Sequence, residues 1–185
     1  MDAVSAAFAA VPRAGFLRSS DRTRAGHDGP IPIGLGQTNS QPRTVADMLR
    51  LLDVRPGHHV LDVGAGSGWT TALLAHLVGP EGRVRGVELE PVLAGWGAAN
   101  LFATGQSWAS LEPADPGVLG LPDHAPYDRI LVSAMARRLP EDLVAQLADP
   151  GRMVAPVAGH MLLVVRSSGG TTTTRHGRYR FVPLR

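Results

Sequence analysis

Apolar residues follow two spacings along this chain, and the two spacings alternate. Between Arg43 and Leu52 they fall at positions i, i+3, i+4 and i+7, the spacing of one helix face, and Pro56-Gly57 ends that pattern. Short runs rich in apolar residues predict buried strands, and they lie at residues 60–63, 84–89, 129–133, 153–157 and 161–165. Helical spacing separates the first four runs, at residues 73–78, 91–101 and 143–147. The alternation predicts an α/β fold with a doubly wound, mostly parallel sheet and an antiparallel C-terminal strand pair.

Four stretches outside this alternation carry weaker signals. Residues 3–11 are rich in apolar side chains and predict a short helix. Prolines interrupt the stretch 108–120, which therefore fits a strand and loop poorly. Residues 167–174 have the low-complexity composition of a turn, whereas residues 179–184 are expected to form a final strand.

Composition narrows the class of protein. A chain of 185 residues, 44% hydrophobic and 18% charged, is expected to form a single globular domain over residues 1–185. The absence of cysteine excludes disulfides, thiolate metal sites and a cysteine nucleophile. All 18 basic residues are arginine, which excludes a lysine Schiff base or a P-loop lysine. The histidines lack metal-ligand spacing, so no metal is expected.

Charge and hydropathy bear on partners and location. The net charge is only +2, with no dense arginine stripe outside the tail, which disfavours a nucleic-acid partner. The longest run of large apolar residues, Met161 to Val165, is too short to span a bilayer. Asp2 precedes the apolar N-terminal stretch, where a secretory signal would begin with basic residues. We therefore expect a cytoplasmic protein with no membrane partner, and a monomer.

The strongest chemical signal is a glycine-rich loop after the first buried run. Leu61-Asp62-Val63 leads into Gly64-Ala65-Gly66-Ser67-Gly68, with glycine at every second position. Such a loop lets the backbone turn tightly and approach a ligand at the carboxyl end of a strand. By itself the loop is equally consistent with a tight connection between strand and helix.

Glu88 favours the ligand. It lies 20 residues beyond Gly68, at the end of the next expected strand, where a carboxylate can accept hydrogen bonds from a ribose diol. The spacing Gly-x-Gly-x-Gly, rather than Gly-x-Gly-x-x-Gly, favours S-adenosylmethionine over a dinucleotide. The loop, Glu88 and Leu89 form the expected cofactor site. Asp62 is expected either to reach the methionine end of the cofactor or to accept hydrogen bonds from loop N–H groups.

A second segment carries a family resemblance. Residues 31–42, Ile31-Pro32-Ile33-Gly34-Leu35-Gly36-Gln37-Thr38-Asn39-Ser40-Gln41-Pro42, resemble the signature segment of the protein-L-isoaspartate O-methyltransferases. Its specific part runs from Gly34 to Pro42, which other methyltransferases lack. Further matches keep the family's order over nearly the whole chain: Val11-Pro12-Arg13, Leu61 to Gly68, Val87-Glu88-Leu89, His124 to Asp128, Pro150 to Val157 and Arg180 to Leu184.

The resemblance implies a Rossmann-like, class I S-adenosylmethionine-dependent methyltransferase. Residues 1–42 would form the substrate side, and residues 43–185 the cofactor-binding core with the C-terminal strands. The implied reaction transfers a methyl group to the α-carboxylate of an isoaspartyl residue in a damaged protein or peptide, and repair then proceeds through a succinimide. Because a carboxylate is already ionised at neutral pH, such an enzyme mainly aligns its reactants.

The resemblance also assigns substrate-side residues. Ser40 corresponds to the family's active-site serine, whose hydroxyl would orient the substrate carboxylate without acting as a nucleophile. Ser40 is also placed to cap the helix that opens at Pro42, and the two roles are compatible. Gln37, Thr38 and Ser133 are expected beside the substrate.

Several positions depart from the family pattern. Where the family usually carries Gly-Asp-Gly, this chain has Ala114-Asp115-Pro116-Gly117, so Asp115 is either an adenine-site residue or a plain turn residue. Arg137 and Arg138 could attract a peptide carboxylate or lie in a solvated loop. His160 stands where the family often has glutamine, and is either a substrate-side residue or an incidental polar one. The chain also looks shorter than typical bacterial members at its N-terminus and near its end.

These departures gather on the substrate side and keep two alternatives open. One is a peptide-tailoring methyltransferase that acts on a normal Asp of a dedicated precursor peptide. The other is a degenerate module that binds the cofactor without activity.

Overall fold

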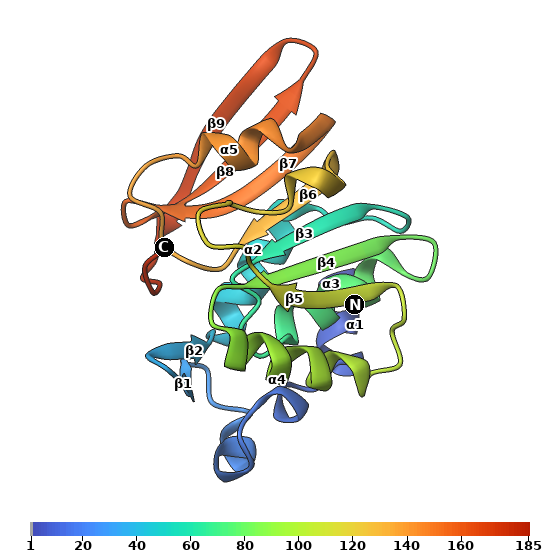
Figure 1. The fold of residues 1–185 in the computed structure, drawn as a ribbon, viewed down its shortest axis with the longest axis vertical. Coiled ribbons are helices and arrows are strands. Elements are labelled where there is room, and N and C mark those ends of the chain that lie inside the picture. Colours follow the sequence, from blue (N-terminus) through green and yellow to red (C-terminus); the bar gives the residue numbers. More distant parts are fainter. Residues whose placement is uncertain (1) are drawn as a thin grey trace.

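The computed structural model describes residues 2–185 and confirms the α/β architecture (Figure 1). The α-helices are α1 (Ala3–Ala10), α2 (Pro42–Leu52), α3 (Trp69–Val78), α4 (Pro91–Phe102) and α5 (Glu141–Ala145). The strands are β1 (Ile31–Gly34), β2 (Gln37–Asn39), β3 (His59–Val63), β4 (Arg83–Glu88), β5 (Ala109–Pro113), β6 (Tyr127–Val132), β7 (Leu147–Val157), β8 (His160–Ser167) and β9 (Gly170–Arg178). The 3-10 turns are η1 (Arg13–Phe16), η2 (Ser19–Arg24) and η3 (Pro122–His124).

The order of the strands creates the place where a ligand can bind. Within residues 2–185, one sheet has the order β5-β4-β3-β6-β7-β8-β9, and β1 pairs with β2 in a separate hairpin. Neighbours from β5 to β7 are parallel, while β8 and β9 are antiparallel additions. The chain winds outward from β3 to β5 and then returns to β6 on the other side of β3. In doubly wound sheets such a reversal opens a crevice at the carboxyl ends of the strands.

Burial on both faces explains why the central strands are rich in apolar residues. Val60 and Leu131 pack with α1, α2 and α3 on one face of the sheet. Their neighbours Leu61 and Ile130 pack with α5 on the other face, because successive side chains of a strand point to opposite sides. The parallel sheet is therefore a central layer with helices packed on both faces.

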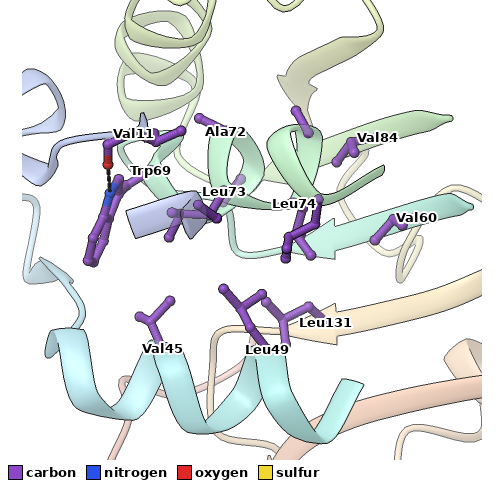
Figure 2. Packing of buried hydrophobic residues seen from close by; sticks show 14 of the residues in the cluster. Val11, Val45, Leu49, Val60, Trp69, Ala72, Leu73, Leu74, Val84 and Leu131 are labelled. Atoms are coloured by element: carbon purple, nitrogen blue, oxygen red, sulfur yellow. Dashed lines mark hydrogen bonds between the residues drawn. The ribbon is translucent and has the colours of Figure 1, made fainter. Parts of the chain in front are cut away.

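Helix α2 covers the first face through the stripe that its sequence predicts. Figure 2 shows Leu49 of α2 pointing toward Leu73 and Leu74 of α3. Nearby, the indole N–H of Trp69 donates to the Val11 carbonyl oxygen at 3.1 Å, which ties α3 to the end of α1. No helix within the described residues is long and apolar enough to cross a membrane.

Three expectations for the outer parts of the sheet are wrong. Residues 109–113 do form a strand, because Pro113 comes last in an edge strand, where its missing N–H leaves no ladder bond unmade. Of the stretch 167–174, only Ser168-Gly169 forms the expected turn; the threonines belong to β9, since β-branched side chains favour extended backbone. Residues 179–184 do not form the expected strand; Val182 and Leu184 instead hydrogen-bond with Met135.

Candidate cofactor and substrate site

A cavity of about 1010 Å³ opens at the carboxyl ends of β3, β4 and β6, where the winding reverses. Its wall includes Val63-Gly64 at the end of β3, Glu88-Leu89 at the end of β4 and Ser133-Ala134 just after β6. The loop after β5 contributes Asp115, and the β1–β2 hairpin contributes Gln37 and Thr38. Small-ligand pockets typically measure about 300–1,000 Å³, so the cavity has room for a nucleoside cofactor and part of a second molecule.

The glycine loop forms one wall of this cavity. Gly64, Gly66 and Gly68 have positive φ values of 81°, 53° and 83°. A Cβ on Gly68 would lie 2.7 Å from the carbonyl oxygen of Gly97 in α4, so this glycine is required by close packing as well as by its backbone angle. Gly64 and Gly66 line the cavity, whereas Ala65, Ser67 and Gly68 lie behind the wall.

Glu88 holds a carboxylate beside the loop. The residue is only 7% exposed. Its Oε2 accepts a hydrogen bond from the Gly66 N–H at 2.9 Å, and its Oε1 accepts one from the Glu90 N–H at 3.0 Å. Each oxygen keeps a second lone pair, so the carboxylate can still accept from the hydroxyls of a ribose. The loop and the carboxylate therefore fit the nucleoside end of S-adenosylmethionine.

Asp62 points away from the cavity. The side chain is fully buried, and its Oδ2 accepts a hydrogen bond from the Thr71 hydroxyl of α3 at 2.7 Å. Its Oδ1 has no hydrogen-bond partner within residues 2–185. Burial raises the pKa of Asp62 to about 7, and the negative charge of Glu88 adds to the rise, while the Thr71 hydrogen bond opposes it. The partner of Asp62 is thus Thr71, not the loop N–H groups, and Asp62 is not part of the cavity wall.

Ser40 lies close to the cavity but not on its wall. It is half-buried, and its carbonyl oxygen accepts a hydrogen bond from Arg13 at 2.9 Å. The N-cap residue of α2 is Gln41, and its side chain makes no capping hydrogen bond. The predicted helix-capping role of Ser40 is therefore wrong, because Ser40 stands one residue before the capping position.

Of the other predicted site residues, Asp115 and Ser133 lie on the cavity wall and His160 does not. Asp115 lines the cavity and also begins a turn, since its carbonyl oxygen accepts the Val118 N–H at 3.1 Å. Its contact with adenine stays a prediction. Ser133 lines the cavity at the end of β6. His160 does not, because the register of β7 and β8 pairs it with Val157 at the turn between them.

Residues 116–120, 136–142 and 182–185 also line the cavity. Apart from Arg137 and Arg138, the sequence assigned none of them to the site. Arg137 and Arg138 are exposed and lie on this wall, and their attraction of a peptide carboxylate stays a prediction. Residues 180–184 match the family, but their apolar pattern predicted a packed strand rather than part of the cavity wall. The sequence also gave no sign of the β1–β2 hairpin, which carries Gln37 and Thr38.

Within residues 2–185, no cluster of histidine, aspartate and glutamate has the arrangement of a metal site. The polar groups that reach the cavity are instead carboxylates, hydroxyls, an amide and the three arginines Arg137, Arg138 and Arg185. This set suits an organic ligand and a carboxylate partner.

Comparisons with known proteins agree with this geometry. The sequence profile of the protein-L-isoaspartate(D-aspartate) O-methyltransferase family matches residues 1–185. A protein-L-isoaspartate O-methyltransferase of Methanopyrus kandleri is 47% identical over 186 residues, which cover 98% of this chain and 82% of the relative. Its counterpart in Methanocella arvoryzae is 44% identical, with 94% of each chain covered.

Solved structures give the same result. A protein-L-isoaspartate O-methyltransferase matches the whole chain with a TM-score of 0.90 and 25% identity, and this chain spans 61% of that protein. A Plasmodium falciparum structure assigned to the same activity, in complex with S-adenosyl-L-homocysteine, matches with a TM-score of 0.85 and 25% identity over 91% of its length. Sequence, fold and the position of the cavity agree, and the chain belongs to the protein-L-isoaspartate O-methyltransferase family.

Proposed function

We propose that this chain transfers a methyl group from S-adenosylmethionine to the α-carboxylate of L-isoaspartyl residues in damaged proteins or peptides. One observation carries the proposal: the family's signature hairpin and the glycine loop face the same cavity, through Gln37, Thr38, Gly64 and Gly66. A methyl donor held on the loop would therefore meet a substrate held by the hairpin.

The cofactor would be held mainly by backbone and by one carboxylate. Gly64 and Gly66 allow its close approach, and Glu88 would accept hydrogen bonds from the ribose hydroxyls. Asp115 lies on the wall after β5, where it could contact the adenine. When bound, S-adenosylmethionine supplies an electrophilic methyl group.

The substrate carboxylate needs orientation rather than activation. It is ionised at neutral pH, so the site needs no general base. Thr38 and Ser133 present hydroxyl donors on the cavity wall, Gln37 presents an amide, and Ser40 stands beside the hairpin. Alignment of two bound reactants can supply a large part of a transfer barrier. Apolar wall residues such as Leu119 and Leu139 would help to exclude water.

A methyl-transfer assay with labelled S-adenosylmethionine tests the proposal. Two synthetic peptides would differ only in Asp or isoAsp at one position. We expect methylation of the isoAsp peptide alone. Ser40→Ala should lower kcat/KM about 10- to 100-fold, because a hydrogen bond to a charged group is worth about 1.5–3 kcal/mol. The matched control is Ser168→Ala, at an exposed serine between β8 and β9, which should behave as wild type.

Other outcomes of this assay favour the alternatives. Methylation of the normal Asp peptide would favour a peptide-tailoring enzyme with a dedicated precursor peptide. Methylation of neither peptide, with S-adenosylmethionine still bound in calorimetry, would favour a binding module without activity. A cytoplasmic location, a monomeric state and a single domain over residues 1–185 stay predictions; light scattering of the purified chain tests the second.

A further inference from the structure

Three buried polar side chains from distant parts of the sequence are joined in a row. Arg13 of η1, Asn39 at the end of β2 and Ser67 of the glycine loop are 5%, 4% and 3% exposed. The Arg13 Nε donates to Asn39 Oδ1 at 2.6 Å, and the Asn39 Nδ2 donates to Ser67 Oγ at 3.0 Å. This Arg13–Asn39–Ser67 chain connects the N-terminal segment, the signature hairpin and the cofactor loop.

Arg13 also binds the backbone on both sides of the hairpin. Its NH1 donates to the carbonyl oxygen of His27 at 2.8 Å. Its NH2 lies 2.9 Å from the carbonyl oxygen of Gly29, 3.0 Å from that of Asn39 and 2.9 Å from that of Ser40. The guanidinium stacks near the Trp69 ring, with 5.5 Å between its central carbon and the ring centroid. Although burial lowers the pKa of Arg13 to about 10, the group stays protonated at neutral pH.

The other end of the chain is fixed within the cofactor loop. The Ser67 carbonyl oxygen accepts a hydrogen bond from Asn100 Nδ2 of α4 at 3.0 Å. The preceding residue, Gly66, donates to the Glu88 carboxylate. Ser67 itself does not line the cavity, since its hydroxyl is turned toward Asn39. A ligand that fixes the loop would therefore also fix the position of this hydroxyl.

We propose that the Arg13–Asn39–Ser67 chain is a positioning device that makes the segment Gln37–Gln41 follow the state of the cofactor loop. The inference rests on the proposed function, in which this segment holds the substrate. Buried donors and acceptors are costly to leave unpaired, so the loop and the segment keep their relative position or both rearrange. Binding of the cofactor then orders the substrate side, and by reciprocity the substrate strengthens cofactor binding. All three are positioning residues, because none of them lines the cavity.

Arg18 offers a matched control for this inference. It also holds the hairpin, through hydrogen bonds from Nε and NH2 to the Ile33 carbonyl oxygen at 3.2 and 3.1 Å. It is exposed and stacks on Trp96, and no hydrogen bond joins it to the glycine loop among the described residues. Loss of Arg18 should therefore loosen the hairpin without cutting its connection to the cofactor loop.

Hydrogen exchange with and without S-adenosylhomocysteine tests the device. In the wild type, the product should slow exchange of the backbone amides of residues 37–41. In Ser67→Ala and Asn39→Leu this protection should disappear, while calorimetry shows that S-adenosylhomocysteine still binds; in Arg18→Gln the protection should persist. Should Asn39→Leu fail to fold, Ser67→Ala, which removes a single hydroxyl, decides the test.

Steady-state kinetics of Ser67→Ala distinguish a positioning role from a purely structural one, because only the first changes the two KM values unequally. In Ser67→Ala the KM for the isoAsp peptide should rise by a factor on the order of 5 to 150, the usual range of coupling between two sites, while the KM for S-adenosylmethionine changes much less. Wild-type protection of residues 37–41 in Ser67→Ala, or no protection by the product in the wild type, would overturn the inference. The exchange experiment needs no methyl transfer. Failure of the repair activity with protection intact would therefore overturn the proposed function alone.

Discussion

At the scale of single residues, Asp62 makes stability depend on pH. Burial raises its folded-state pKa to about 7, from an ordinary value of 3.8. The folded chain therefore holds the proton more tightly than the unfolded chain. Its contribution to stability is complete below about pH 4 and is lost as the pH rises to about 7, by an amount of up to about 4 kcal/mol. Ionisation of Asp62 thus opposes folding at neutral pH.

Replacement of Asp62 checks this sign. Between pH 5 and pH 8, the free energy of unfolding of the wild type should fall by roughly 2–3 kcal/mol more than that of Asp62→Asn. Urea denaturation at both pH values measures the difference. Asp123→Asn, at an exposed aspartate, should keep the wild-type dependence. Identical pH dependence in wild type and Asp62→Asn would contradict the assignment.

A comparison of Gly68 with Gly57 distinguishes the cost of a left-handed backbone from the cost of a steric clash. Gly68 and Gly57 share a φ of 83°, but a Cβ on Gly57 would meet nothing within 4 Å, whereas a Cβ on Gly68 would press on the Gly97 carbonyl oxygen. Gly57→Ala should cost about 1–2 kcal/mol from the left-handed backbone alone. Gly68→Ala should cost clearly more and weaken cofactor binding. Thermal unfolding and calorimetry measure both; equal losses in the two variants would rule out the packing argument.

At the scale of elements, α2 is anchored through its buried stripe. Its N-cap Gln41 makes no side-chain capping hydrogen bond, although the Arg43 N–H in the first turn donates to the Asp28 carboxylate at 3.1 Å. Leu49 is 1% exposed against α3 (Figure 2). Leu49→Ala should therefore destabilise the fold by about 2–5 kcal/mol. Leu51→Ala, on the half-buried side of the same helix, should cost markedly less. Denaturant unfolding compares the two, and equal losses would contradict the assigned orientation of the helix.

At the scale of the whole molecule, the cavity wall comes from both halves of the sheet, so a bound ligand would join them. S-adenosylhomocysteine at about 100 times its Kd should stabilise the folded state by about 2.7 kcal/mol. For a chain of this size, that raises Tm by roughly 5–10 °C. Glu88→Ala should abolish most of the rise at the same ligand concentration, because the ribose loses its acceptor. A full rise in Glu88→Ala, seen by differential scanning fluorimetry, would remove Glu88 from the cofactor site.

Much of the fold could be predicted because its signals are local. The apolar runs that became β3, β4 and β6 are buried on both faces, and the i, i+3, i+4 spacing of α2 marks its buried stripe directly. The wrong predictions concern segments whose structure depends on contacts with other strands. The threonines of β9 were predicted to form a turn, because their extended conformation depends on pairing with β8. Pro113 led us to predict no strand there, because the sequence does not show that β5 lies at the edge of the sheet, where proline is tolerated.

The parts of the candidate site that lie at the ends of strands could be predicted from the sequence. The glycine loop and Glu88 each follow an apolar run, so their meeting at one edge follows from a parallel sheet. Arg13 and Asn39 were missed as a pair, because 26 residues separate them and nothing local signals their 2.6 Å contact. Asp62 was expected to contact either the cofactor or the loop N–H groups, because its actual partner, Thr71, is brought to it only when α3 packs on β3.

The sequence by itself determined the parallel sheet, the loop that suits a nucleoside and the acid that follows it, since these depend on spacing and on residue type. The tertiary structure alone decided which side chains face the cavity. The register of β7 and β8 places His160 at a turn, off the cavity wall. The packing of α3 on β3 brings the Thr71 hydroxyl to Asp62. The fold of the first 40 residues places Arg13 within hydrogen-bond distance of the hairpin backbone. The physical reason is range: periodicity records which face of an element is buried, whereas a site is made by contacts between elements far apart in the chain.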